Sequence, residues 1–304
     1  MPPFRPRRRA PYGAHQSIAG GYARAVDRAA ETGCEALQVF TRNINQWQAK
    51  PISPDEASQF RQAVVDAGIA FVVAHDSYLI NPATADVSLR QKSIAGLVEE
   101  LRRAELLGIP WVVAHPGAAG EQPRDKAVAR AAAGMAEALR KTSSLRAGIL
   151  IETTAGQGTC LGSAFEEIGA MLRVIDARPG LRHRVGVCLD TCHVFAAGYR
   201  LFPAAALEAT LDAFDSAIGL DRLICIHAND SKREFGSHVD RHEGIGKGMI
   251  GREAFRLIVN HPRLASVPLI LETPKEGPDG KPSPARDRAN LAILRRMVRQ
   301  PVTK

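Results

Sequence analysis

The chain has 304 residues, of which 45% are hydrophobic and 24% charged, a composition that is ample for a sizeable core. No run approaches the roughly 18 consecutive apolar residues of a membrane-spanning helix, so we expect no membrane span. The basic start MPPFRPRRR is not followed by the apolar segment of a signal peptide, so we expect no secretory signal either. The net charge of +8 favours a polyanionic partner, although an ordinary surface with surplus arginine would give the same value.

Eight short strand-like runs, each followed by a segment of helical character, succeed one another along the chain. They span residues 12–15, 36–40, 70–75, 111–115, 148–152, 185–190, 223–227 and 268–272. The middle runs are continuous stretches rich in Val, Ile and Leu, which is typical of parallel strands covered on both faces. Between the runs, Ser53 and Glu56 form a capping box, and Gly33, Gly68 and Gly108 stand where helices should end.

Eight strand–helix units in series predict an α/β fold. We expect a single-domain (β/α)8 TIM barrel over residues 12–300, with its active site at the C-terminal ends of the strands. A doubly wound open sheet is the structural alternative. Residues 1–11 would form a basic, flexible N-terminal arm.

Six of the predicted strands end on a side chain of metal-ligand type. These residues are separated by 40, 37, 38, 37 and 45 positions, and they are His75, His115, Glu152, Asp190, His227 and Glu272. A closed barrel brings all of its strand ends to one mouth, whereas an open sheet would hold its outer strands too far apart. Burying three imidazoles beside three carboxylates is costly unless bound cations neutralise them, so the pattern predicts a metal centre.

A second set of ligand-type residues lies just beyond the strand ends. His193 belongs to the turn DTCH, and Asp240 and His242 belong to DRH in the loop after the seventh strand. Nine ligands suit two or three ions, and their mixture of imidazole and carboxylate favours zinc, with manganese or iron as alternatives. Clustered metals are suited to hydrolysing a phosphodiester, because they acidify a water and stabilise the departing alkoxide.

Two other patterns have simpler explanations. The stretch GKGMIG at 246–251 fits GxGxxG but does not directly follow a strand, so we interpret it as a flexible loop leading into the seventh helix. Cys188 and Cys192 have no second pair at zinc-finger spacing and are interpreted as buried thiols. The five cysteines are an odd number in a long chain, which favours a reducing cytoplasm.

Between about residue 12 and about residue 275 the chain resembles bacterial endonuclease IV, the metal-dependent class of AP endonuclease on a TIM barrel. The stretches that carry the resemblance are GAHQSIAGG (13–21), AHDSYLINPA (74–83), AHPGA (114–118), IETTAGQGTCLG (151–162), VGVCLDTCHVFAAGY (185–199), NDSKREFGSHVDRHEGIGKGMIG (229–251) and LILETP (269–274).

The resemblance implies a trinuclear zinc enzyme of DNA repair. Such an enzyme cleaves double-stranded DNA on the 5′ side of an abasic site, leaving a 3′-hydroxyl and a 5′-deoxyribose phosphate, and also trims blocked 3′ ends. The implied ligands are His75, His115 and Glu152 for one ion, Glu152, Asp190, His227 and Glu272 for the second, and His193, Asp240 and His242 for the third. The implied nucleophile is a hydroxide held between metals, with Glu272 and the bridging Glu152 as the catalytic carboxylates.

The resemblance also points to residues that contact DNA. The loop TRNINQW at 41–47 corresponds to the family loop that enters the DNA stack, but Asn45 stands where family members often carry Arg, so Arg42 or Gln46 would have to substitute. Tyr78 would line the site of the flipped nucleotide. A rim of basic residues would contact phosphates, and its members are Arg42, Lys50, Lys232, Arg233, Arg241, Lys247 and Lys275, of which Lys232 and Arg241 lie inside the matched motifs.

Two other functions compete with the nuclease. A metal-dependent sugar isomerase or epimerase also gathers carboxylates and His at barrel strand ends, but it needs one or two ions and a small closed pocket. A DNA-binding protein that has lost catalysis would not be expected to keep all nine ligands. We expect a monomer that acts on DNA in the cytoplasm, in association with the nucleoid.

Overall fold

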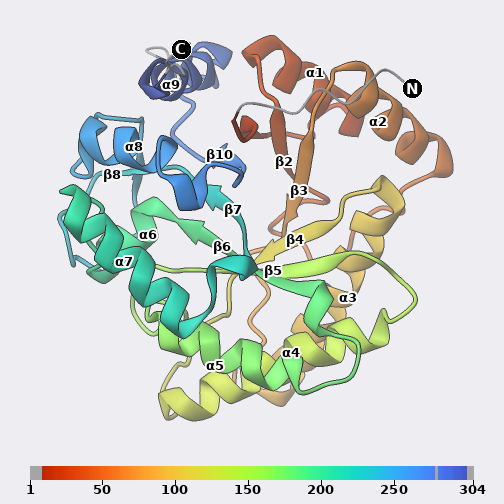
Figure 1. The fold of residues 1–304 in the computed structure, drawn as a ribbon. Helices are drawn as coiled ribbons and strands as arrows, with labels where there is room; N and C mark the ends of the chain where they lie inside the picture. The colour runs from red at the N-terminus through yellow and green to blue at the C-terminus, as the bar shows by residue number, and fades with distance from the viewer. Residues whose placement is uncertain (1–8, 278–279, 300–304) are drawn as a thin grey trace.

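In the computed structural model, which describes residues 9–277 and 280–299, eight parallel strands form a closed barrel surrounded by helices (Figure 1). The barrel strands are β1 (Tyr12–Gln16), β2 (Ala36–Phe40), β3 (Phe71–His75), β4 (Trp111–Ala114), β5 (Gly148–Glu152), β6 (Val185–Asp190), β7 (Leu223–His227) and β10 (Leu269–Leu271). They follow the order β1-β10-β7-β6-β5-β4-β3-β2, so β1 closes the barrel between β2 and β10. The predicted TIM barrel is confirmed, and the open sheet is excluded.

Helices follow the barrel strands, and some of the helix ends have the predicted chemistry. The helices are α1 (Tyr22–Thr32), α2 (Pro54–Asp66), α3 (Val87–Leu107), α4 (Arg124–Lys141), α5 (Phe165–Asp176), α7 (Ala204–Ala217), α8 (Gly251–Val259) and α9 (Pro284–Met297), with a short additional α6 (Thr191–Ala197) and the 3-10 turns Arg182–Arg184, Leu220–Arg222 and Pro262–Leu264. The capping box is present, because Ser53 Oγ accepts from Glu56 N–H at 3.2 Å and Ser53 N–H donates to Glu56 Oε2 at 2.9 Å. Among the described helices, none combines the length and apolarity that crossing a bilayer requires.

Side chains inside the barrel form layers. The lower layer is apolar and takes one residue from each of seven strands: Ala36, Val73, Val113, Leu150, Cys188, Cys225 and Ile270. At β1 there is no room for a side chain, since a Cβ on Gly13 would lie 1.6 Å from the carbonyl oxygen of Ala36. Because side chains alternate along a strand, the next inward-facing positions toward the C-terminal ends carry the polar residues of the mouth.

The start of the chain and the long loop after β7 have structure that the sequence periodicity did not predict. Residues 1–8 of the predicted arm lie outside the described residues, and Ala10 is buried with its N–H donated to the Ala265 carbonyl at 3.1 Å. After β7, the two-residue strands β8 (Asp230–Ser231) and β9 (His242–Glu243) pair antiparallel.

The glycine-rich stretch 246–251 is a loop that leads into α8, as predicted, but it is not free. It wraps around the buried carboxylate of Asp230, which accepts from the N–H groups of Gly246, Gly248 and Ile250 at 2.9, 3.1 and 2.9 Å. Backbone amides that a dinucleotide phosphate would need are therefore already occupied by a side chain of the protein itself.

Candidate metal centre

All nine predicted ligands converge at the C-terminal mouth of the barrel. Four of them end strands β3, β5, β6 and β7, and two directly follow β4 and β10. The ligand atoms fall into three groups, within each of which they lie no more than 4.8 Å apart: His75, His115 and Glu152; Glu152, Asp190, His227 and Glu272; and His193, Asp240 and His242. These are the same three sets that the resemblance implies.

Glu152 lies at the centre of the cluster and is completely buried. Its Oε2 is 3.1 Å from Nε2 of both His75 and His115, and its Oε1 is 2.9 Å from Nδ1 of His227. Burial alone would raise the pKa of Glu152, but the imidazoles of His227 and His115 hold it well below its usual range. Both oxygens of an ionised carboxylate therefore face ring nitrogens from different strands, which is the geometry of a bridging ligand.

The second group surrounds Nδ1 of His227. Glu272 Oε2 approaches this atom at 3.1 Å, and Asp190 Oδ2 lies 3.9 Å from it. Burial alone would lower the pKa of His227, but the carboxylates of Glu272 and Glu152 hold it well above its usual value of 6.5. In the absence of metal, protons on the imidazoles supply the positive charge that these carboxylates require.

The third group is assembled by α6 and the β8–β9 hairpin. Asp190 caps α6 by accepting the N–H of His193 at 2.9 Å, which turns the His193 ring into the mouth. Asp240 bridges the two imidazoles of this group, with Oδ2 3.2 Å from His193 Nε2 and Oδ1 3.3 Å from His242 Nε2. Burial alone would raise the pKa of Asp240, yet the facing imidazoles of His193 and His242 lower it to about 2.

The donor set fits divalent cations. Nε2 of His193 and Nε2 of His242 are buried and make no hydrogen bond within the described part of the chain. A buried ring nitrogen that faces carboxylates but has no hydrogen bond is the observation expected where a metal ion would complete the site. Cys188 and Cys192 are free and buried, as predicted.

Several residues that hold the ligands in place were missed from the sequence. Nδ1 of His193 lies 2.8 Å from the Thr153 carbonyl, Nδ1 of His75 lies 2.9 Å from the Asp76 carbonyl, and Asn229 Nδ2 donates to Asp190 Oδ2 at 2.7 Å. Such partners orient metal ligands. Gln38 also belongs to this set, and its position as a single polar residue in the apolar run ALQVF was a signal that could have identified it.

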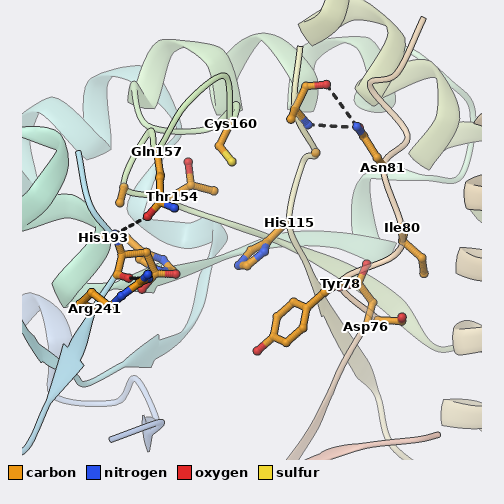
Figure 2. Close-up of a pocket in the computed structure, with 15 residues that line it drawn as sticks. Asp76, Tyr78, Ile80, Asn81, His115, Thr154, Gln157, Cys160, His193 and Arg241 are labelled. Carbon is orange, nitrogen blue, oxygen red and sulfur yellow. Dashed lines mark hydrogen bonds and ion pairs between the residues drawn. The ribbon is translucent and has the colours of Figure 1, made fainter. Parts of the chain in front are cut away.

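A cavity of about 300 Å³ adjoins the cluster and is lined by His115, His193, Asp240 and the exposed Tyr78, among others (Figure 2). Tyr78 keeps 61% of its surface exposed and lies nearly parallel to His115, with ring centroids 6.3 Å apart. On the same segment as Tyr78, Asn81 fixes one wall by accepting from the Ala118 N–H at 3.1 Å and donating to its carbonyl at 3.3 Å. The predicted nucleotide-lining residue thus stands beside a candidate metal ligand.

The other predicted DNA contacts divide into exposed and buried residues. Asn45, Gln46, Lys232 and Arg241 are exposed at the mouth. Arg42 is a correction, because it is only 4% exposed and its Nε donates to Glu100 Oε1 at 2.6 Å while its NH1 group donates to the Trp47 carbonyl at 2.7 Å. A guanidinium buried in this way holds the loop together and does not reach a phosphate.

Comparison with known proteins places this geometry in context. The family model described as xylose isomerase-like TIM barrel matches residues 26–297. A protein of Chloroflexus aurantiacus named probable endonuclease 4 is 46% identical over 94% of this chain and 98% of its own length. The crystal structure of endonuclease IV from Thermus thermophilus has a TM-score of 0.80 and 36% identity, covering 94% of this chain and 98% of that one. D-psicose 3-epimerase from Clostridium cellulolyticum shares the fold alone, with a TM-score of 0.68 at 13% identity, covering 95% of this chain and 100% of that one.

Proposed function

The chain belongs to the xylose isomerase-like TIM-barrel family and, within it, to the endonuclease IV proteins, and we propose a specific reaction for its barrel mouth. The protein is an AP endonuclease of DNA repair. We propose that it hydrolyses the phosphodiester on the 5′ side of an abasic site in duplex DNA, leaving a 3′-hydroxyl and a 5′-deoxyribose phosphate. We further propose that it trims blocked 3′ ends and acts as a monomer.

The observation that carries this proposal is the set of three ligand groups around Glu152 beside a cavity open to solvent. Metal dependence follows from the family, and we propose three zinc ions, with manganese or iron as alternatives. When bound, the ions would acidify a water, neutralise phosphoryl oxygens and stabilise a departing alkoxide. The proposed ligands are the nine side chains of the three groups, with Glu152 shared between two of them.

The side chains of the chain itself have distinct proposed roles in this step. Glu272 orients the attacking water: the imidazole of His227 holds the pKa of Glu272 low against the effect of burial, so this carboxylate stays ionised and can accept a hydrogen bond from the water. The oxygen of the water bonds to phosphorus as the P–O3′ bond breaks, and the proton that the water gives up ends on the released oxygen, which becomes the 3′-hydroxyl of the upstream nucleotide. Tyr78 offers its exposed ring to the extruded abasic nucleotide, whose extrusion requires no base to be unpaired.

Positively charged and polar side chains around the mouth would hold the duplex. Lys232 and Arg241 are exposed on the loop that carries the third ligand group, and Asn45 and Gln46 are exposed on the loop after β2. We propose that the first pair contacts phosphates and that the second pair enters the DNA at the lesion. The role of a wedge falls to Asn45 and Gln46, since Arg42 is buried.

An abasic duplex tests the function directly. A synthetic duplex with one tetrahydrofuran site, incubated with the zinc-loaded protein, should be nicked on the 5′ side, and the upstream product should be extended by a DNA polymerase. The same duplex without the lesion is the control, and prior removal of metal by a chelator should stop the reaction. Turnover of ketoses without any nick would support the epimerase alternative, and binding without nicking would support a non-catalytic DNA-binding protein.

A further inference from the structure

Gln38 is a fully buried polar side chain inside the barrel. It lies on β2, two residues after Ala36, which belongs to the apolar layer within the barrel, so Gln38 faces inward one layer nearer the mouth. In the parallel register it is paired with His15 of β1 on one side and Val73 of β3 on the other. None of the nine candidate ligands comes from β1 or β2, so Gln38 connects the metal centre to a side of the barrel that contributes no ligand.

The Gln38 amide reaches two candidate ligands on other strands. Its Oε1 lies 2.7 Å from Nε2 of His227 on β7. Its Nε2 donates to Glu272 Oε1, beyond the end of β10, at 2.5 Å and lies 3.1 Å from Nδ1 of His15. The amide therefore uses both of its hydrogens and one lone pair.

Chemistry allows only one orientation of this amide. An ionised Glu272 can only accept hydrogen bonds, so the NH2 group of Gln38 must face it. Oε1 then faces His227, and an oxygen can only accept, so the His227 nitrogen in contact with it must be Nε2–H. The other ring nitrogen, Nδ1, is thereby left to face Glu152, Glu272 and Asp190, where it can offer a lone pair to a cation.

The same hydrogen bond orients the Glu272 carboxylate. Gln38 holds Oε1, and the remaining oxygen, Oε2, points to within 3.1 Å of His227 Nδ1. One amide consequently sets the tautomer of one ligand and the rotation of the carboxylate that we propose orients water.

We propose that Gln38 is a positioning residue of the reaction, which acts through His227 and Glu272 without touching the substrate. The inference rests on the proposed metal-dependent hydrolysis. Loss of a residue that orients metal ligands typically costs about 10–100-fold in metal affinity or activity. The defect should fall on metal retention and kcat, and KM for abasic DNA should stay unchanged because Gln38 is completely buried beneath the ligands.

The test compares Gln38→Met with Leu37→Met. Methionine has nearly the volume of glutamine but cannot make these hydrogen bonds, and Leu37 is the buried neighbour on β2 whose side chain faces the helices instead. For each variant we would measure zinc equivalents after a chelator challenge, kcat and KM on the abasic duplex, and the unfolding temperature of the metal-free protein. We expect Gln38→Met to lose zinc affinity or kcat by about 10–100-fold at unchanged KM, and Leu37→Met to resemble wild type.

A measurement on the wild-type protein does not depend on how well a variant folds. Nitrogen-15 NMR of the zinc-loaded protein should show His227 with a proton on Nε2 and metal at Nδ1. The opposite tautomer would overturn the proposal, as would a Gln38→Met protein with normal zinc retention and kcat, or one whose loss is matched by Leu37→Met. Because the tautomer and zinc retention are measured without DNA, a wild-type protein that fails to nick would count against the proposed function and leave the inference on Gln38 to be judged separately.

Discussion

The metal cluster and the loop after β2 share one mouth of the barrel, yet different interactions hold them in place. Most candidate ligands sit at or directly after the ends of barrel strands, whose backbone pairing determines where they lie. The loop of residues 41–50 has no such pairing and is held by side chains, those of α3 foremost, with Tyr22 and Ser77 donating to the Thr41 and Ile44 carbonyls. Arg103 donates to the Thr41 carbonyl at 2.7 Å and to the Lys50 carbonyl at 2.9 Å, and so it holds both ends of the loop.

Glu100, on the same helix, completes this clamp. Its Oε1 accepts from Arg42 Nε at 2.6 Å and its Oε2 accepts from Thr41 Oγ1 at 2.5 Å. The cluster is thus supported by many strands at once, whereas the loop relies on a few buried charged groups. Catalysis and lesion recognition should therefore be separable by single substitutions.

The largest effect should come from the cluster. Glu272→Gln keeps the shape of the side chain but removes its negative charge, so we expect kcat on an abasic duplex to fall by about 10²–10⁴-fold while DNA still binds. Steady-state kinetics and a binding assay would measure the two quantities. Glu276→Gln is the matched control, because Glu276 is exposed four residues further along. Near-normal nicking by Glu272→Gln would reject the role of this carboxylate.

Glu100→Gln should instead damage the loop. It leaves the Arg42 guanidinium buried without a counter-charge, and removing one partner of a buried pair typically costs about 3 kcal/mol. We expect a lower free energy of unfolding and a raised KM, with zinc content unchanged. Glu99→Gln is the control, since the Glu99 side chain is 43% exposed and its carboxylate lies 3.7 Å from the Arg103 guanidinium, which is too long for a hydrogen bond. A loss of zinc in Glu100→Gln would show that the two regions are not independent.

The dependence on pH should distinguish the metal-free from the loaded cluster. Burial alone would lower the pKa of His193 and of His227, but facing carboxylates hold both well above 6.5. These imidazoliums stabilise the metal-free fold fully below a pH of about 6.5, and that contribution is lost as the pH rises through their folded-state pKa values.

Metal ligation needs neutral imidazole, so zinc binding should release protons and tighten as the pH rises in this window. Calorimetric titration of zinc in buffers of different ionisation enthalpy would count the protons, and thermal unfolding of the metal-free protein would follow its stability. The prediction fails if zinc binds without proton release, or if the metal-free unfolding temperature climbs over the same rise in pH.

The smallest effect should come from the exposed rim. Lys232 is exposed next to the β8–β9 hairpin, and Lys232→Gln removes one charge without a buried partner. We expect a modest loss of DNA affinity and a decrease of about one in the slope of log affinity against log salt, at unchanged kcat. Binding isotherms at several salt concentrations would measure the slope, and an unaltered slope would exclude Lys232 as a phosphate contact.

The sequence predicted the features that follow from its periodicity, namely the barrel strands and the residues at their ends. Each of the eight runs lies within one residue of an observed barrel strand, and the six strand-end residues meet because a closed barrel leaves them no other place. What it could not predict depends on contacts between distant segments. Arg42 was expected on the DNA-contacting rim because it lies in the loop after the second strand, at the barrel mouth, but its buried partner Glu100 is 58 residues away.

The same reason explains the other omissions. Gln38 stands out locally as the single polar residue of ALQVF, but its partner His227 lies 189 positions away, and no local pattern reveals that contact. The strands β8 and β9 have two residues each, which is too short for any alternation to be visible. Long-range polar contacts are specified by three-dimensional position, so sequence periodicity alone does not reveal them.

The Asp230 carboxylate has a consequence for how the third ligand group receives its cation. It accepts hydrogen bonds from the amides of residues 246–250, and Asp230 itself lies on β8 of the β8–β9 hairpin. The two ends of the segment that carries Asp240 and His242 are therefore held together. Much of the conformational entropy of this segment is already lost when the chain folds. An incoming ion meets ligands that need little further ordering, and more of the intrinsic coordination energy is available as affinity.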